Sequence, residues 1–267
     1  MGLFDMFKKK NCDLCGGEIG LLGNRKLEDG NCCKHCANKL SYWFDDRRHS
    51  TVAQIRQQLT YRAENEAALQ TFQPTKVIGE NYLVYIDEKN RRFFVARSED
   101  YLSENPDILT YDQVLSCELK VDDSKTEIMR EIKDAEGNTK EVSYSPRRFL
   151  YEYDFEMLIR VQHPYFDDMR FRLNNSTLEL ESDGTLGGRR FNLGLDPVMD
   201  PTRDINYRSY VSMGEEIVRI LTSQPEAPAE EPAPAEAPAQ NIPKFCPECG
   251  APTNGSKFCE YCGSKLC

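Results

Sequence analysis

The sequence has few of the residues that usually build active sites, and it lacks the long apolar stretches that cross membranes. Its 267 residues include three histidines and one tryptophan, and no run of eighteen apolar residues. A transmembrane helix needs about 20 mostly apolar residues in succession, so we expect no membrane span. No glycine-rich segment matches a Walker or Rossmann pattern, and we expect Gly184, Gly187 and Gly188 to form a turn.

The three histidines occupy positions that favour structural or solvated roles over catalysis. His35 lies between two cysteines, His49 precedes a predicted helix, and His163 precedes Pro164 at the end of a predicted strand. We therefore predict that the protein is not an enzyme. A zinc-dependent or thiol enzyme is the rival hypothesis.

Excess positive charge is also missing. The net charge is −10, and residues 41–222 carry 24 Lys and Arg against 33 Asp and Glu, a net charge of −9. Residues 1–40 and 242–267 carry only +2 and +1. An acidic surface repels phosphate groups, so this balance opposes general attraction to nucleic acid or anionic lipid.

No secretory signal is visible at the start of the chain, where MGLFDMFKKK places its apolar residues before the lysines. Residue 6 is Met where the myristoylation pattern has Ser or Thr. We therefore expect a cytoplasmic protein with reduced cysteines. The alternative is that residues 1–10 lie on a membrane surface, with the apolar side chains inserted and the lysines near lipid headgroups.

Cysteine, in contrast, is abundant and clustered. Ten of the eleven cysteines lie towards the two ends of the chain, and eight of them form four C-x-x-C pairs. Two intervening residues let one tight turn present both sulfurs to one ion, and two such turns complete the four-sulfur shell of structural zinc. We therefore predict two structural zinc ions. The predicted ligands are Cys12, Cys15, Cys33, Cys36, Cys246, Cys249, Cys259 and Cys262.

The cysteine pattern also bears on a redox site and on the choice of metal ligands. A thioredoxin-like redox site would need one reactive pair beside a βαβ pattern, whereas two pairs cluster at each end here. Cys32 and His35 are spare candidate ligands in the N-terminal set, which leaves that ligand set open. Glycine follows three of the four pairs, at Gly16, Gly250 and Gly263, where the chain leaving such a turn often needs a positive φ.

The chain divides into five predicted parts. They are a four-cysteine zinc module (1–40), a connector helix (41–74), an antiparallel β domain (75–222), a linker (223–243) and a C-terminal zinc ribbon (244–267). The linker alternates Pro, Ala and Glu, a composition that cannot bury a core. In the connector, Thr51 and Gln54 fit a capping box, and Val52, Ile55, Leu59 and Ala63 follow at helical spacing.

The middle of the chain shows the two-residue period of strands. Tyr82–Asp87 and Arg91–Arg97 flank a turn and predict a hairpin. A third strand carries Leu115, Cys117, Leu119 and Val121 on one face. The clearest alternation places these side chains on one face: Phe149, Tyr151, Tyr153, Phe155, Met157, Ile159 and Val161. The domain ends in an amphipathic helix, so we expect a mainly β protein with an antiparallel barrel or sandwich closed by that helix.

Three parts of the sequence resemble known families. The first forty residues resemble a bacterial domain of unknown function that has two C-x-x-C pairs around a Leu-x-Asp-Gly motif, here Leu27–Gly30. The last residues resemble the double-knuckle zinc ribbon of many bacterial proteins. The middle is similar to pleckstrin-homology-like domains, in which seven antiparallel strands are capped by a helix. The resemblance implies metal-ligand roles for the eight paired cysteines and no established activity.

These observations favour an interaction or adaptor protein with a protein or peptide partner. The β domain would supply the binding surface, and the tethered ribbon would add a second contact. Nucleic-acid binding by the zinc ribbons is an alternative, which we disfavour because the ribbons carry little charge and, we expect, few exposed aromatic residues. Binding to a membrane surface through residues 1–10 and the β domain is the other alternative.

Overall fold

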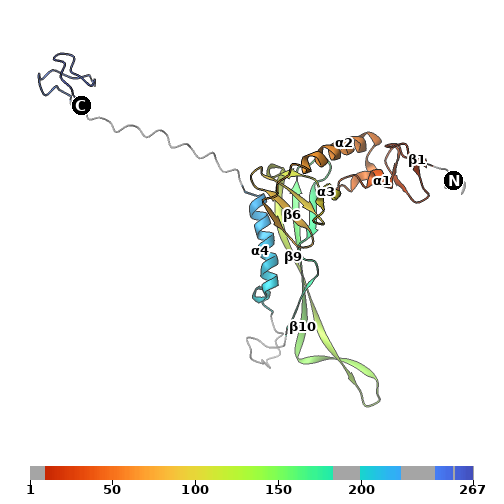
Figure 1. Cartoon of the computed structure of the whole chain (residues 1–267). Helices are drawn as coiled ribbons and strands as arrows, with labels where there is room; N and C mark the ends of the chain where they lie inside the picture. The colour runs from red at the N-terminus through yellow and green to blue at the C-terminus, as the bar shows by residue number, and fades with distance from the viewer. Residues whose placement is uncertain (1–9, 183–198, 224–243, 255, 267) are drawn as a thin grey trace. The chain divides into compact units, whose positions relative to one another are not determined.

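The computed structural model describes residues 10–182, 199–223, 244–254 and 256–266 (Figure 1). The chain divides into two compact units, residues 1–223 and 224–267, which are described separately below. The predicted membrane contact, residues 1–10, lies outside the described residues except for Lys10. The predicted linker, residues 223–243, lies outside them except for Ser223, and so do Gly184–Gly188 and Cys267. Among the described helices, none has the length and apolar character needed to cross a membrane.

The N-terminal part of unit 1 consists of two small hairpins and short helices. Its elements are β1 (Lys10–Asn11), β2 (Glu18–Ile19), β3 (Asn24–Lys26), β4 (Asn31–Cys33), α1 (Lys34–Ala37) and the 3-10 helix η2 (Asp46–His49). Strand β1 pairs with β2, and β3 pairs with β4, both antiparallel. Leu27 is fully buried among the cysteines, and Ile55 from the following helix completes this small core. The four-cysteine module therefore packs directly on that helix.

Helix α2 (Val52–Leu69) begins with the predicted capping box, in which Thr51 and Gln54 bond each other's backbone N–H groups. Its buried face differs from the predicted apolar stripe. Ala63 is exposed, whereas Gln58, Arg62 and Asn65 are buried between Ile55 and Leu69. The predicted stripe was wrong at Ala63, because Arg62 and Asn65 take its place on the buried face and bond polar groups about forty residues further along the chain.

Those polar partners tie α2 to the β domain. The Arg62 guanidinium donates to Asp107 at 2.8 Å, and the Ser41 hydroxyl donates to the same carboxylate at 2.7 Å. The Asn65 amide donates to the Pro106 carbonyl at 2.7 Å and accepts the N–H of Ile108 at 2.9 Å. Buried polar groups are stable in a protein interior when they are hydrogen-bonded in this way. Zinc module, helix and β domain therefore form one unit.

The first sheet of the β domain contains β5 (Lys76–Ile78), β6 (Leu83–Asp87), β7 (Arg92–Ala96) and β8 (Leu109–Thr110), all antiparallel and in that order. Strands β6 and β7 form the predicted hairpin, and both of their faces are buried. Phe93 and Val95 point into the main core, while Phe94 packs on the other face against Leu69 and Phe72. Burial on both faces explains why these strands are nearly continuous apolar runs.

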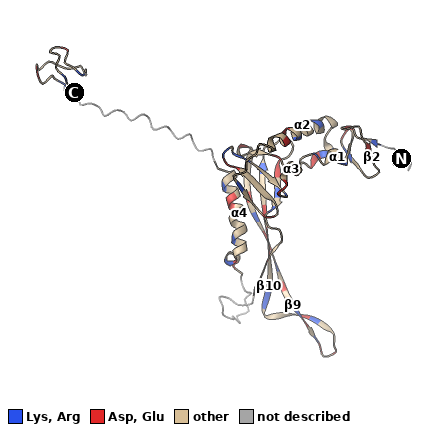
Figure 2. Ribbon diagram, in the orientation of Figure 1, with Lys and Arg blue, Asp and Glu red and all other residues tan. Residues whose placement is uncertain are grey.

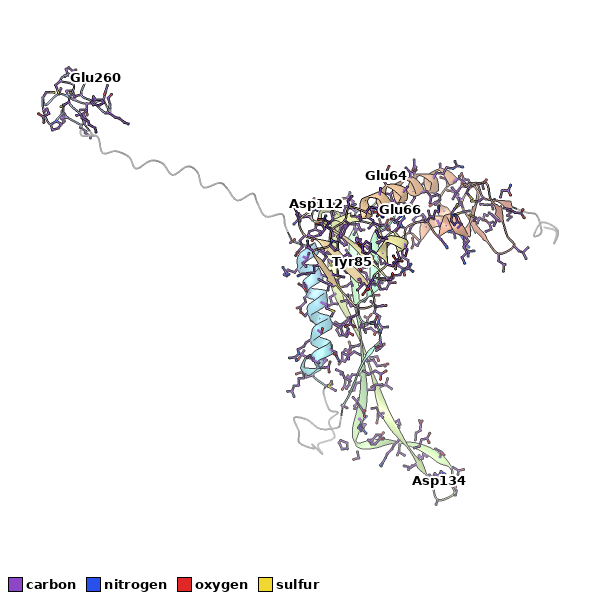
Figure 3. The ribbon with its side chains drawn as sticks, in the orientation of Figure 1. Glu64, Glu66, Tyr85, Asp112, Asp134 and Glu260 are labelled. Carbon is purple, nitrogen blue, oxygen red and sulfur yellow. The ribbon has the colours of Figure 1, made fainter. Side chains whose placement is uncertain are left out.

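The second sheet is built around one long hairpin, β9 (Val114–Lys133) and β10 (Thr139–Val161). Strand β10 also pairs with β11 (Asp168–Arg172) and β12 (Leu178–Glu181) on its other edge. All seven alternating residues predicted from Phe149 to Val161 are buried. Residues 122–148 have no buried side chain, and Asp134 lies at the tip of the hairpin (Figure 3). Both strands carry Lys and Arg interspersed with Asp and Glu (Figure 2).

The two sheets pack their apolar faces together in one core, but they do not close into a barrel. Within the described residues, no strand of one sheet pairs with a strand of the other. Strand β10 uses one edge for β9 and the other edge for β11 and β12, so neither is available to the first sheet. The protein is mainly β and antiparallel as predicted, and the barrel form of that prediction was wrong.

Helix α4 (Ile205–Leu221) covers the second sheet. Asp204 caps it by accepting the N–H groups of Asn206 and Tyr207, and Ile217 and Leu221 are buried on the predicted face. A Cβ atom on Gly214 would lie 2.7 Å from two carbons of Leu119 on β9. This glycine therefore lets the helix approach the strand closely. The remaining short helices of this part are α3 (Tyr101–Glu104), η3 (Tyr111–Gln113) and η4 (Pro201–Arg203).

One residue of the predicted third strand lies on the other face. Cys117 is buried as predicted, but Leu115 is 67% exposed. Ser116 pairs with Arg160 and Val114 pairs with Val161, so Leu115 is the extra residue of a β-bulge. A bulge interrupts the two-residue period and turns the unpaired side chain away from its expected face.

Candidate metal centres

The first C-x-x-C pair forms a tight turn that ends in a glycine. The Gly16 N–H donates to the Cys12 carbonyl at 2.7 Å, and the Cys12 N–H donates to the Gly17 carbonyl at 2.8 Å. Gly16 has a φ of 75°, a conformation that residues with a Cβ rarely adopt. The turn places Cys12 and Cys15 side by side, as the spacing predicts.

The second pair of this module is built differently, because a helix begins inside it. Cys33 is the N-cap of α1, and its sulfur accepts the N–H of Cys36 at 3.4 Å. The Cys33 N–H in turn donates to the sulfur of Cys12 at 3.3 Å. Because the chain continues into α1, no residue with a positive φ is needed after Cys36. This explains why Ala37 stands where the other three pairs have glycine.

The four sulfurs of Cys12, Cys15, Cys33 and Cys36 lie within 4.8 Å of one another. Sulfurs about 2.3 Å from a tetrahedral zinc ion are about 3.8 Å apart, and the Cys15 and Cys33 sulfurs are separated by 3.8 Å. A disulfide would bring them to about 2.05 Å. The group therefore has the dimensions of a zinc site and is able to hold a zinc ion.

The spare candidate ligands lie outside this group. Cys32 is fully buried in the small core, and its S–H donates to the Cys33 carbonyl at 3.3 Å. Burial raises the pKa of Cys32 to about 12, which favours the protonated thiol. His35 is exposed on α1. Among the described residues, the four-sulfur group therefore consists of the two C-x-x-C pairs, without Cys32 or His35.

Unit 2 contains the same turn twice. The N–H groups of Gly250 and Gly263 donate to the carbonyls of Cys246 and Cys259 at 2.9 and 2.8 Å. The two glycines have φ values of 70° and 71°, as their positions predict. The sulfurs of Cys246, Cys249, Cys259 and Cys262 lie within 4.8 Å of one another, with two separations of 3.6 and 3.7 Å. This group is also able to hold a zinc ion.

Metal binding requires the thiolate form, and hydrogen bonds favour it at Cys12 and at Cys246. Burial alone would raise the pKa of Cys12, but backbone N–H groups, chiefly that of Cys33, outweigh it and lower the pKa to about 6. In unit 2, the Ser264 hydroxyl is 3.1 Å from the sulfurs of both Cys246 and Cys262. This contact is the main cause that lowers the pKa of Cys246 to about 6. Burial raises the pKa of Cys36. At Cys249 the Ala251 N–H is outweighed by contacts with neighbouring thiols, which raise the pKa to about 12.

The two centres differ in the packing around them. The buried apolar residues around the N-terminal group include Leu27, Ile19, Leu40 and Ile55. The described part of unit 2 buries one large apolar side chain, Leu266, beside two of its cysteines. Its aromatic residues are exposed instead: Phe245 by 63%, Phe258 by 57% and Tyr261 by 74%. The expectation of few exposed aromatics was therefore wrong for this unit, because a core this small cannot cover them.

The structure explains the Leu-x-Asp-Gly motif, whose residues had no assigned role in the sequence. Leu27 fills the core, and the Asp29 carboxylate accepts the N–H of Val52 at 2.7 Å, at the first residue of α2. A Cβ atom on Gly30 would lie 2.6 Å from Val52 and 2.8 Å from the Asp13 carboxylate. The motif therefore packs the zinc module against the first residue of α2.

Residues 10–58 match a protein family described as "Domain of unknown function (DUF4428)". The match covers the first four-cysteine group, the Leu-x-Asp-Gly motif and the first two turns of α2, which are the elements that the Asp29 contact joins. No curated protein and no solved structure matches the chain.

Proposed function

We propose that the protein is a cytoplasmic, non-enzymatic interaction protein that uses two zinc ions as structural supports. The support for this role is that each four-sulfur group supplies four protein ligands. A tetrahedral zinc ion with four thiolates has no open position for water or substrate, whereas catalytic zinc keeps one. A reducing compartment belongs to the proposal because the eight thiols must stay unoxidised to bind metal.

The β domain, supported by the zinc module, is proposed to supply the main binding surface. The buried bonds of Arg62 and Asn65 hold the zinc module, α2 and the β domain in one unit. A rigid unit loses little conformational entropy when it binds a partner. The similarity of the middle to pleckstrin-homology-like domains belongs to this proposal, since domains of that build accept peptides at strand edges or beside the helix.

Unit 2 is proposed to act as a second contact. Phe245, Phe258 and Tyr261 are exposed aromatic side chains that could pack on a partner. Once one contact has bound the partner, the linked second contact is held at a high effective concentration. Two contacts of moderate affinity therefore give tighter overall binding. The same aromatic residues favour one other function, binding of single-stranded nucleic acid by base stacking. The net charge of +1 over residues 242–267 argues against it.

The full chain, expressed with an affinity tag in its native cell and purified under reducing conditions, tests this function. We expect a protein partner to co-purify with the wild type and to be recovered less after Cys246→Ser, which removes a ligand from the C-terminal centre only. A matched Lys257→Ala variant, at an exposed position of the same unit, should behave as wild type. Recovery of nucleic acid that is lost as salt rises would instead support the second candidate. Recovery of nothing above an untagged control would contradict the interaction function.

A further inference from the structure

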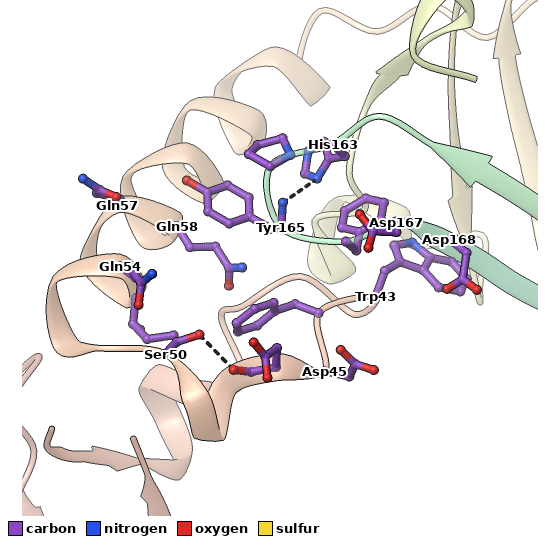
Figure 4. Close-up of a pocket in the computed structure, with 15 residues that line it drawn as sticks. Trp43, Asp45, Ser50, Gln54, Gln57, Gln58, His163, Tyr165, Asp167 and Asp168 are labelled. Atoms are coloured by element: carbon purple, nitrogen blue, oxygen red, sulfur yellow. Dashed lines mark hydrogen bonds between the residues drawn. The ribbon is translucent and has the colours of Figure 1, made fainter. Parts of the chain in front are cut away.

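A cleft of about 640 Å³ lies between α2 and the loop that joins β10 to β11 (Figure 4). One wall comes from residues 43–58, inside the region that matches the family, and the other from residues 163–168. Ligand sites are commonly cavities of about 300–1,000 Å³ placed where two domains meet. The size and position of this cleft are those of a binding site.

The side chain of Gln58 is a buried polar group that lacks a partner. Gln58 is 1% exposed, and neither its amide oxygen nor its amide nitrogen has a hydrogen bond among the described residues. Figure 4 shows this side chain extending from α2 into the cleft. Arg62 and Asn65, on the same face of the helix, are both hydrogen-bonded. A buried amide without hydrogen bonds destabilises the protein. Gln58 therefore favours a ligand group that can both donate and accept a hydrogen bond, as a peptide group does.

The rim of the cleft is acidic. Asp46 pairs with His49 at 2.7 Å, but Asp45, Asp167 and Asp168 have no ion-pair partner in the part of the chain that the structure describes. No lysine or arginine is among the described lining residues. His163 supplies little opposing charge, since burial lowers its pKa and its Nε2 lies 3.1 Å from the Tyr61 hydroxyl. The carboxylates therefore favour a positively charged ligand.

Aromatic side chains line the same cleft. Trp43 and Phe44 lie on one wall, and Tyr165 and Phe166 on the other. Aromatic faces attract guanidinium and ammonium groups, arginine more often than lysine. A free metal ion would use the carboxylates but would leave the N–H donors of Gln58 and the aromatic faces without a role. Carboxylates, aromatic rings and an amide together fit a basic peptide better than a cation alone.

We propose that this cleft binds a basic peptide segment of a partner protein. The Gln58 amide pairs with a main-chain peptide group, and Asp45, Asp167 and Asp168 receive an arginine or lysine side chain. This inference rests on the proposed interaction function and adds to it the binding surface and the chemistry of the partner.

The chain contains its own reporter for this site, because Trp43 is the only tryptophan and lines the cleft. The probe is the N-acetylated, C-amidated pentapeptide Gly-Arg-Gly-Arg-Gly, titrated into the purified zinc-loaded full chain at about 0.15 M salt, where long-range charge effects are screened. We expect a saturable change in tryptophan fluorescence. The same peptide with Glu in place of Arg should give none.

Variants at the rim and at the base of the cleft separate specific binding from general attraction. Asp167→Asn with Asp168→Asn changes only exposed side chains, and we expect binding about tenfold weaker, equivalent to about 1.4 kcal/mol. Gln58→Leu removes the amide and should weaken binding similarly, with folding checked by circular dichroism. The control is Asp122→Asn with Asp123→Asn, an exposed aspartate pair on β9 outside the cleft, which should bind as wild type.

Three outcomes would overturn the proposal. One is no response to the arginine peptide, and another is an equal loss in the β9 control. The third is a response to calcium chloride in place of the peptide, which would identify a cation site. These results are independent of the purification experiment: a recovered partner with no peptide binding overturns this inference alone. Peptide binding without any cellular partner overturns only the interaction function.

Discussion

The guanidinium of Arg62 and the carboxylate of Asp107 lie 2.8 Å apart, although 45 positions separate them in the chain. Their side chains are 6% and 1% exposed. The Arg62 side chain also donates to the Lys39 and Asn105 carbonyls, and Ser41 donates to Asp107. This pair therefore connects the zinc module, α2 and the β domain at one point.

Arg62→Ala should destabilise unit 1 by about 3–5 kcal/mol, because it leaves the Asp107 charge buried without its partner. Urea unfolding followed by circular dichroism measures this change. Arg170→Ala removes an exposed arginine that pairs with Glu156 at 3.3 Å, and should cost at most about 1 kcal/mol. Equal effects of the two substitutions would contradict the connecting role of Arg62.

Zinc removal should affect the two units unequally. Structural zinc contributes about 10–16 kcal/mol of apparent binding energy in small zinc domains, and unit 2 has little apolar core to replace it. We expect elemental analysis to find two zinc ions per chain, and a chelator to collapse the amide spectrum of residues 244–266 completely. The N-terminal module should keep part of its packing through Leu27 and Ile55. A unit 2 that stays folded in chelator would disprove this dependence.

Cys32 and Cys33 are neighbours with different expected roles. Cys33→Ser removes a sulfur from the four-sulfur group, so the purified chain should hold one zinc ion in place of two. Cys32→Ala should keep both ions and lose only packing, since its sulfur lies in the core. Zinc content measured on both variants decides the matter. Loss of zinc from Cys32→Ala would make Cys32 a ligand.

Gly30→Ala should destabilise the zinc module by about 1–3 kcal/mol, the usual cost of overpacking. The added Cβ would lie 2.6 Å from Val52 and 2.8 Å from Asp13, so α2 would have to shift on the module. Gly20→Ala is the matched control, because a Cβ at that position meets nothing within 4 Å and the φ is ordinary. Thermal unfolding of both variants gives the comparison, and equal melting temperatures would refute the close-approach argument.

Asp87 should give a measurable pH dependence of stability. Burial opposes its ionisation, but hydrogen bonds from Asn90 and Arg92 prevail and hold its pKa below the usual 3.8. The pKa of Asp87 is lower in the folded protein than in the unfolded chain. The stabilisation from its carboxylate is therefore fully present above pH 3.8 and is lost as the pH falls through the folded-state pKa. Asp87→Asn should therefore be less stable than wild type at pH 7, with the difference shrinking towards pH 3. Both proteins share the acid loss of zinc, so the difference isolates Asp87.

Local patterns in the sequence determined much of this protein. The C-x-x-C spacing and the glycines after three of the pairs produce the cysteine turns, because each turn involves only a few consecutive residues. The capping box at Thr51 and the alternation from Phe149 to Val161 are likewise short-range features, and the structure contains both. A structural feature that depends only on a few neighbouring residues can be predicted from the sequence without knowing the fold.

The tertiary structure decided the features that depend on distant partners. Arg62 and Asn65 are polar residues on a helix, and only the approach of residues 105–108 makes their burial favourable. Leu115 is exposed because of a bulge set by its pairing with β10. The cleft exists because residues 43–58 and 163–168 meet, and neither segment alone indicates that Gln58 is buried without a partner. Hydrogen-bond partners and strand register are set by contacts between distant segments, so no local pattern encodes them.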